Sequence, residues 1–214
     1  MGDPEIRNSS DTVAKIISVV FHPLFMPVYG MAIILSALTP FGYLPFTVKK
    51  LIFLIIGVNN VFLPLMLLPF LMQMKLISSW TLAERKERYI PLVITTLLYA
   101  ATSYIVFRFP IPFFIKAFIF STFFLSLFVT IINFSFRISL HAAGAGALFG
   151  LLLLLCFRSY TFAGWHFVLV AIAAGMILTS RLKLNVHTPQ QVWWGFFTGF
   201  MVVLIFMSFF QHFA

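Results

Sequence analysis

The chain has 214 residues, of which 62% are hydrophobic and 9% are charged, and its formal net charge is +9. A soluble globular domain carries roughly 25% charged residues, so this composition excludes an ordinary water-soluble fold and is typical of a membrane protein. The positive charge favours an anionic headgroup or substrate. Nucleic acid is a poor partner, because the basic residues fall in short connections between apolar runs rather than on one soluble face.

Apolar runs of membrane-spanning length follow one another along almost the whole chain. A transmembrane helix needs about 20 apolar residues, and such runs lie at 16–38, 51–77, 91–108, 111–134, 141–157, 162–180 and 190–211. We therefore predict an all-α, polytopic integral membrane bundle of six or seven transmembrane helices. A polar N-terminal segment at 1–15 precedes a single membrane domain at 16–214. We expect a multi-pass protein of a bacterial cytoplasmic membrane, and the sequence leaves a homo-oligomer possible.

The first two spans are not expected to be straight helices. His22-Pro23 and Pro27 interrupt the first span, and a proline inside a helix removes a hydrogen bond and kinks the chain. A broken or re-entrant first segment is therefore expected. The second span contains the adjacent polar residues Asn59 and Asn60 and a proline soon after them, so it is predicted to bend as well.

Three polar stretches interrupt the apolar runs, at residues 81–91, 137–141 and 180–191. Two predicted crossings separate the first stretch from the second, and two more separate the second from the third. All three are therefore expected on the same membrane face, whatever the path of the first span. Residues 88–214 hold seven Lys or Arg and no Asp or Glu. Cations without acidic partners in an apolar setting indicate an anion, and phosphate is the obvious candidate.

The third polar stretch predicts the start of a helix with a histidine just before it. Thr188-Pro189-Gln190-Gln191 has the N-cap Thr, the Pro at the first helical position and the Gln three residues after the cap that such starts favour. His187 then lies at a helix N-terminus, where backbone amides and the helix dipole favour an anion. Gln191 can hydrogen-bond the imidazole and fix its tautomer, or it can close a capping box with Thr188, and the sequence leaves both roles open.

The second polar stretch ends at His141, which begins a helix of small residues. Small residues recur at four-residue spacing in this helix and in the last span, at Ala142, Gly146, Gly150, Gly195 and Gly199. Such spacing lets two helices approach closely. If these two helices pack together at their starts, His141 and His187 face each other across a small pocket. One imidazole would then attack a phosphoryl group while the other protonates the leaving oxygen.

The basic residues of the polar stretches would hold the phosphate. The expected ligands are Arg181, Arg88, Arg85, Lys86 and the hydroxyl of Ser139, which would offset the charge on the phosphate oxygens. Arg88 has an alternative partner in Glu84, one helical turn earlier. The remaining histidines, His22, His166 and His212, lack neighbouring cations and are predicted to be packing or interface residues. With a single cysteine, Cys156, no thiolate metal site is possible.

Two of the polar stretches resemble motifs of the type 2 phosphatidic acid phosphatase superfamily, membrane enzymes that cleave lipid phosphates through a phosphohistidine. Ser180-Arg181, five residues and then His187 is similar to the third motif of that family, and Ser139-Leu-His141 to the end of the second. The resemblance covers residues 81 to about 200. It implies that His187 is the nucleophile, His141 the general acid, and Arg181 with Ser139 phosphate ligands.

The chain departs from the family pattern at several positions. Ile138 and Leu140 replace the usual Pro and Gly of the second motif, and the first motif, a Lys six residues before Arg-Pro, is not reproduced around Arg88. Gln191 stands where an Asp usually follows the nucleophile by four residues. Gln also occurs there in branches that resemble glucose-6-phosphatase and dolichyl diphosphatase. Because Gln cannot stabilise an imidazolium by charge, it would lower the rate.

These observations predict a lipid phosphate or diphosphate phosphohydrolase that acts by a phosphohistidine mechanism without metal or other cofactor. Membrane prenyl and phosphatidyl transferases hold divalent metal with Asp clusters, and this sequence has none. Phosphatidic acid, phosphatidylglycerol phosphate, undecaprenyl diphosphate and a lipid A phosphate all stay open as substrates. The alternative is a non-catalytic family member that transports or binds a lipid or anion, because intramembrane His and Arg also mark transport pathways. Asn59, Asn60 and Asn133 are the hints of such a path.

Overall fold

The computed structural model describes residues 4–36, 39–79, 82, 84–157 and 164–210, which leaves Thr81 and His212 outside the described residues. Within these ranges every regular element is a helix, and seven stretches are long and apolar enough to cross a membrane. The predicted all-α membrane bundle is therefore confirmed, with seven candidate spans.

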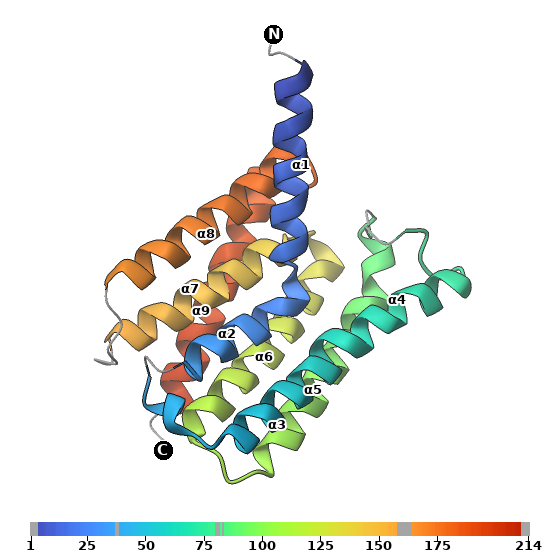
Figure 1. The fold of residues 1–214 in the computed structure, drawn as a ribbon. Coiled ribbons are helices and arrows are strands. Elements are labelled where there is room, and N and C mark those ends of the chain that lie inside the picture. Colours follow the sequence, from blue (N-terminus) through green and yellow to red (C-terminus); the bar gives the residue numbers. More distant parts are fainter. Residues whose placement is uncertain (1–3, 37–38, 80–81, 83, 158–163, 211–214) are drawn as a thin grey trace.

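The main helices, in chain order, are α1 (Pro4–Val20), α2 (Met26–Ile34), α3 (Phe46–Ile56), α4 (Leu63–Gln73), α5 (Tyr89–Phe107), α6 (Phe113–Ser135), α7 (Leu140–Phe157), α8 (Gly164–Lys183) and α9 (Pro189–Phe210). Short helical segments between them are η1 (Pro23–Phe25), η2 (Pro40–Tyr43), η3 (Gly57–Phe62) and η4 (Lys86–Arg88). Figure 1 shows α5 to α9 running alternately up and down. α1 begins beyond one end of the bundle, and α9 ends near the other.

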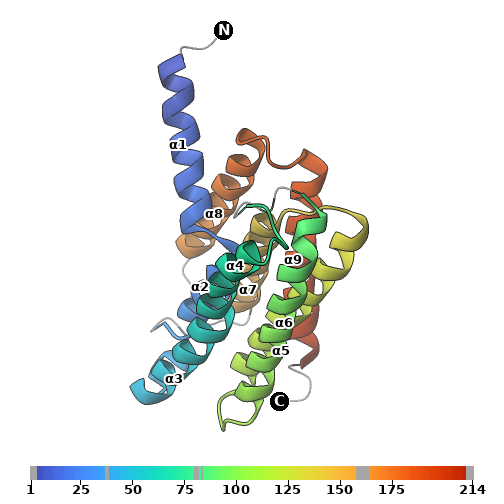
Figure 2. The same ribbon diagram turned by 90° about the vertical axis from the view of Figure 1, so that its right-hand side faces the viewer.

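The first span is broken, as its prolines predicted. α1 ends at Val20, and His22 caps the short segment η1 by accepting the backbone N–H of Leu24 on its Nδ1 at 3.4 Å. Pro23 occupies the first position of η1, where its missing N–H has no cost. Pro27 is tolerated in the same way in the first turn of α2. As a result α1 projects beyond the bundle while α2 runs into it (Figures 1 and 2).

The second span bends at a wide turn. Pro64 lacks the amide hydrogen that a regular helix requires, and the residues before it form the π-helical segment η3, in which the N–H of Leu63 donates to the carbonyl of Val58. This turn directs Asn60 toward α5, where its Oδ1 accepts a hydrogen bond from Thr102 Oγ1 at 2.6 Å. The predicted polar bend is thus an internal contact between two spans.

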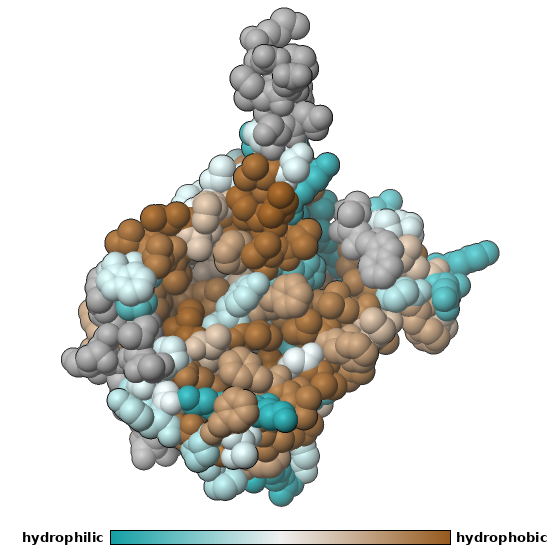
Figure 3. Space-filling view, viewed as in Figure 1, coloured by the Kyte–Doolittle hydropathy of each residue, from teal (hydrophilic) through white to brown (hydrophobic). Residues whose placement is uncertain are grey.

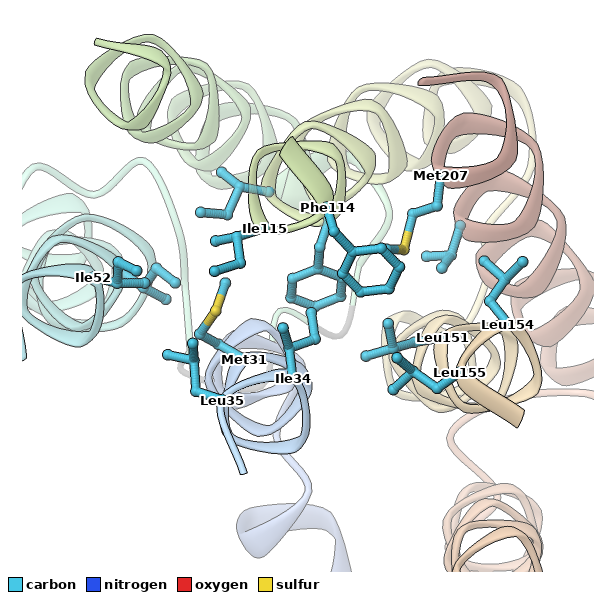
Figure 4. Packing of buried hydrophobic residues seen from close by; sticks show 14 of the residues in the cluster. Met31, Ile34, Leu35, Ile52, Phe114, Ile115, Leu151, Leu154, Leu155 and Met207 are labelled. Carbon is cyan, nitrogen blue, oxygen red and sulfur yellow. The ribbon is translucent and has the colours of Figure 1, made fainter. Parts of the chain in front are cut away.

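The main apolar core lies where α2 inserts between the other helices. Met31 and Ile34 of α2 are fully buried against Phe118 and Ile115 of α6 and Leu151 of α7, and Figure 4 shows these helices converging around them. Large apolar side chains elsewhere point outward, and Figure 3 shows a broad hydrophobic surface over the body of the bundle. In a bilayer such a surface contacts lipid, and packing rather than exclusion of water holds the helices together.

Helices α7 and α9 make the closest contact of the bundle. A Cβ on Gly199 would overlap the carbonyl oxygen of Ala143, and a Cβ on Gly146 would overlap the carbonyl oxygen of Phe196. The four-residue spacing of small residues therefore predicted this pair of helices correctly. At their starts the N–H of Ser139 also donates to the carbonyl of Gln191 at 3.1 Å. This bond ties the beginning of α7 to the beginning of α9.

Candidate active site

The three polar stretches meet at one end of a cavity of about 220 Å³, lined by residues of α2, α4, α5, α6 and α7. The polar end is formed by His22, Arg88, His141, Arg181 and His187. The remaining walls are mostly apolar. The parity of the crossings therefore predicted the common face correctly. In Figure 3 hydrophilic surface is visible beside the lower half of α1, on the side that faces α4.

His187 lies directly before α9 and is only 8% exposed. Its Nδ1 is 2.9 Å from Oε1 of Gln191, and the same oxygen accepts the backbone N–H of Thr188 at 3.3 Å. Because a backbone N–H can only donate, the Gln191 atom that faces both groups is the oxygen, and the imidazole donates its Nδ1–H. The lone pair of His187 is therefore on Nε2.

Gln191 performs both roles that the sequence left open. Its backbone N–H donates to Thr188 Oγ1 at 3.4 Å while its side-chain oxygen accepts the N–H of Thr188, which completes the capping box. An amide oxygen has two lone pairs. It can therefore close the box and accept from His187 at the same time, and the two interpretations are compatible.

The surroundings of His187 keep its imidazole neutral. Burial is the largest cause, and together with the positive charges of Arg88, Arg137 and Arg181 it outweighs the hydrogen bond to Gln191 and lowers the pKa of His187 to about 4. The ordinary pKa of histidine is near 6.5. At neutral pH the residue therefore holds an unprotonated Nε2, the form that a nucleophilic imidazole requires.

The positive charges of three guanidinium groups act on His187. Arg88 ends η4 just before α5, Arg137 lies between α6 and α7, and Arg181 lies in the last turn of α8. The Nε atoms of Arg137 and Arg181 are buried without a hydrogen-bond partner. Buried donors and like charges in one place are costly unless an anion compensates them. The arrangement is therefore suited to an anion with several oxygen atoms, such as phosphate.

The structure also places the remaining predicted ligands. Arg88 is 7% exposed and its Nε donates to the Leu82 carbonyl at 2.8 Å, whereas its alternative partner Glu84 is exposed. Its position favours the ligand interpretation. Ser139 is fully buried, and its Oγ accepts the N–H of Ala142 at 3.4 Å, which caps α7.

Arg85 and Lys86 lie away from the cavity. Arg85 donates through Nη1 to the carbonyl of Ser135 at 2.6 Å, and Lys86 is exposed. Arg137, which was not among the predicted ligands, instead lies close enough for its charge to act on His187. Two features of the sequence could have indicated Arg137. It is the first residue of the second polar stretch, and the half of the chain in which it lies has no carboxylates. Burial lowers the pKa of Arg137 as well.

His141 is held by the N-terminal helix. Its Nε2 is 3.0 Å from the carbonyl oxygen of Ser18, and because a carbonyl only accepts, Nε2 carries the hydrogen. The hydroxyl of Ser18 accepts a hydrogen bond from Arg181 Nη1 at 3.0 Å and donates to the Ala14 carbonyl at 2.9 Å. The last turn of α1 therefore orients two residues of the cavity.

His22 lies in the same cavity, although its sequence neighbours predicted a packing role. Its ring meets that of His141 edge to face, with 5.5 Å between centroids and an angle of 80°. Arg181 is close enough for its charge to act on His22. The sequence could not show this, because Arg181 is distant along the chain. By contrast, the ring of His166 stacks on that of Trp165 with 3.5 Å between centroids.

Comparison with known protein families gives a match. The family model of the PAP2 superfamily matches residues 88–213, more than half of the chain. No curated protein and no solved structure matches. The matched part contains Arg88, Arg137, His141, Arg181 and His187, whereas α1 to α4 lie outside it. In the described part of the chain no three His, Cys, Asp or Glu side chains are grouped so that they could hold a metal ion.

Proposed function

Because the chain belongs to the PAP2 superfamily, we propose that it is a membrane phosphatase that removes phosphate from a lipid phosphate or diphosphate through a covalent phosphohistidine on His187, without a metal ion. One observation carries this proposal. A neutral His187, with its Nδ1–H held by Gln191 and its lone pair on Nε2, lies among three arginines, two of which have unpartnered buried Nε atoms.

The first chemical step forms the phosphohistidine. The Nε2 lone pair of His187 attacks phosphorus while the bond from phosphorus to the leaving oxygen breaks, and that oxygen keeps the electron pair. The negative charge of a bound phosphate favours the protonated form of His141. This form donates the proton of its Nδ1 to the leaving oxygen, because its Nε2–H is occupied by the Ser18 carbonyl. Arg88, Arg137 and Arg181 stabilise the charge on the three equatorial oxygens.

The second step releases inorganic phosphate. Water attacks the phosphohistidine, and the now neutral His141 accepts a proton from that water. The bond between Nε2 and phosphorus breaks, and its electron pair returns to His187. Gln191 keeps the imidazole in one orientation through both steps, because its Oε1 accepts the Nδ1–H throughout.

The apolar walls of the cavity support an amphiphilic substrate. From the histidines the cavity continues between Leu71 of α4, Leu92 of α5 and Leu125 of α6 toward Phe118. A lipid tail in this space would leave its phosphate beside His187, and apolar walls with a few convergent polar groups are usual in small-molecule sites.

Two of the polar residues that suggested a transport path, Asn60 and Asn133, are hydrogen-bonded to separate neighbours. Asn60 pairs with Thr102, and Asn133 Nδ2 donates to the Arg85 carbonyl at 3.3 Å. Thr96 pairs with Thr130 at 2.9 Å between α5 and α6. These contacts join helices and give the transport alternative little support.

The proposal is tested by measuring inorganic phosphate released from a panel of lipid phosphates and diphosphates in detergent with EDTA. We expect release to continue under chelation at an unchanged rate, because the proposed chemistry uses only side chains. Activity that EDTA abolishes and Mg²⁺ restores would contradict the metal-independent mechanism. Absence of phosphate release from every substrate would favour the lipid-binding or transport alternative.

A second expected result concerns pH. In Gln191→Glu a carboxylate replaces the amide beside His187, and a negative neighbour favours the imidazolium, so the pKa of His187 rises. Protonated His187 cannot attack phosphorus. The acid limb of kcat/KM should therefore move to higher pH in this variant, which a pH profile of phosphate release measures.

The control for this result is Gln190→Glu, which adds the same charge at the exposed neighbouring position. It should move the acid limb much less, because solvent screens an exposed charge. An equal shift in both variants would indicate a general effect of charge near the helix start rather than the contact between Gln191 and His187.

A further inference from the structure

The break between α1 and α2 covers the polar end of the cavity with residues that the family model does not include. The matched region begins at residue 88, whereas Ser18 and His22 reach the cavity from the first span. Ser18 contacts His141 and Arg181 and thereby positions them. His22 has no role in the mechanism proposed above, although it lies in the same cavity.

The segment that carries His22 is firmly packed. Met26, which follows η1, is 4% exposed and lies so close to α7 that a Cβ on Gly144 would meet its side chain. The hydroxyl of Tyr29 donates to the Val20 carbonyl at 2.7 Å, which joins α2 back to the end of α1. His22 is therefore held in place from both sides of the break.

The hydrogen-bonding state of His22 follows from its role as a cap. Its Nδ1 accepts the N–H of Leu24, so in the neutral ring the hydrogen is on Nε2. A cavity-lining imidazole with this tautomer presents a donor rather than an acceptor. The anion expected in the cavity accepts hydrogen bonds and matches such a donor.

The contact between His22 and His141 indicates which part of the substrate His22 would contact. Its ring contacts that of His141, the residue assigned above to protonate the leaving oxygen. His22 therefore flanks the leaving group. For a phosphomonoester the leaving group is a lipid alcohol, whose single oxygen is served by His141 alone. For a diphosphate it is a lipid monophosphate, whose further anionic oxygens need donors.

We propose that His22 is a specificity-determining residue, whose Nε2–H donates to the leaving phosphate of a lipid diphosphate and makes diphosphates the preferred substrate class. The inference rests on the proposed function. When the diphosphate is cleaved, the bridging oxygen keeps the electron pair and takes the proton from His141. The lipid monophosphate then departs from the side of His22.

The test compares two substrates with the same tail, farnesyl diphosphate and farnesyl phosphate, in wild type and in His22→Asn. Asparagine is a favoured N-cap residue and retains an acceptor for Leu24, but its shorter side chain removes the imidazole donor. Wild type should have the higher kcat/KM with the diphosphate. The variant should lose about ten- to a hundredfold on the diphosphate, as for a lost hydrogen bond to a charged group, and less than about threefold on the monophosphate.

The controls separate this inference from the proposed function and from a structural role. If His187→Asn abolishes release from both substrates while His22→Asn leaves their ratio unchanged, the specificity proposal is overturned and the phosphatase stands. If His187→Asn releases phosphate normally, the proposed function itself fails. If His22→Asn loses kcat/KM equally on both substrates and has a lowered melting temperature, the role of His22 is structural alone. His166→Asn, which changes a histidine that stacks on Trp165, should leave the ratio unchanged.

Discussion

Replacing His187 by asparagine should lower the rate of phosphate release by more than about a thousandfold, since loss of a nucleophile removes the covalent route entirely. The side chain of asparagine cannot form the phosphorylated intermediate. The protein should still fold, because the capping box between Thr188 and Gln191 does not need the imidazole. Phosphate release from a lipid phosphate, measured beside elution from a sizing column, checks both statements.

A second measurement distinguishes loss of the nucleophile from loss of the acid. Brief incubation with substrate labelled in its terminal phosphate should leave label on wild type and none on His187→Asn. In His141→Asn the first step should slow with a lipid alcohol as leaving group, yet remain fast with a nitrophenyl phosphate, whose leaving group needs no proton. Label on the His187 variant would show that another residue is the nucleophile.

Replacing Gly199 by alanine should strongly destabilise the bundle. The added Cβ would overlap the carbonyl oxygen of Ala143, which is backbone and cannot rotate away, so α7 and α9 must separate. Overpacking usually costs about 1–3 kcal/mol, and a clash between two helix backbones belongs at or above the top of that range. Thermal unfolding in detergent, followed by circular dichroism, measures the effect.

The matched control is Gly175→Ala on α8. Apart from the adjoining backbone of α8 itself, nothing lies within 4 Å of the position that a Cβ would take there, so stability should be unchanged or slightly higher, since alanine favours helix more than glycine. Equal melting temperatures for the two variants would mean that α7 and α9 do not make the contact described above. Gly199→Ala should also lose activity, because separation breaks the bond between Ser139 and Gln191 that aligns the two helix starts.

Local sequence patterns predicted the parts of the site that depend on residues close together in the chain. Thr188, Pro189 and Gln191 specify a helix start within four residues, and the start itself places His187. The small residues of α7 and α9 predicted their pairing, because only small side chains let two backbones touch. The number of crossings placed the three polar stretches on one face without any knowledge of packing.

Contacts between distant spans could not be predicted in the same way. Lipid and protein interior are both apolar, so hydropathy does not show which face of a span points inward. Arg85 and Lys86 were therefore kept as candidates beside Arg88, although of these three only Arg88 reaches the cavity. His22 was assigned to packing because its partners, His141 and Arg181, come from α7 and α8.

By itself the sequence determined a membrane protein of helical spans and a site of histidine and basic side chains on one membrane face. It also indicated the two histidines expected to carry out the chemistry. These properties follow from composition, spacing and parity, which do not depend on how the spans are arranged. Only the tertiary structure decided that Arg137 joins the arginines around His187, and that the break after α1 brings Ser18 and His22 to His141. The physical reason is that these contacts depend on the angle at which each helix packs, and that angle is set jointly by side chains far apart in the chain.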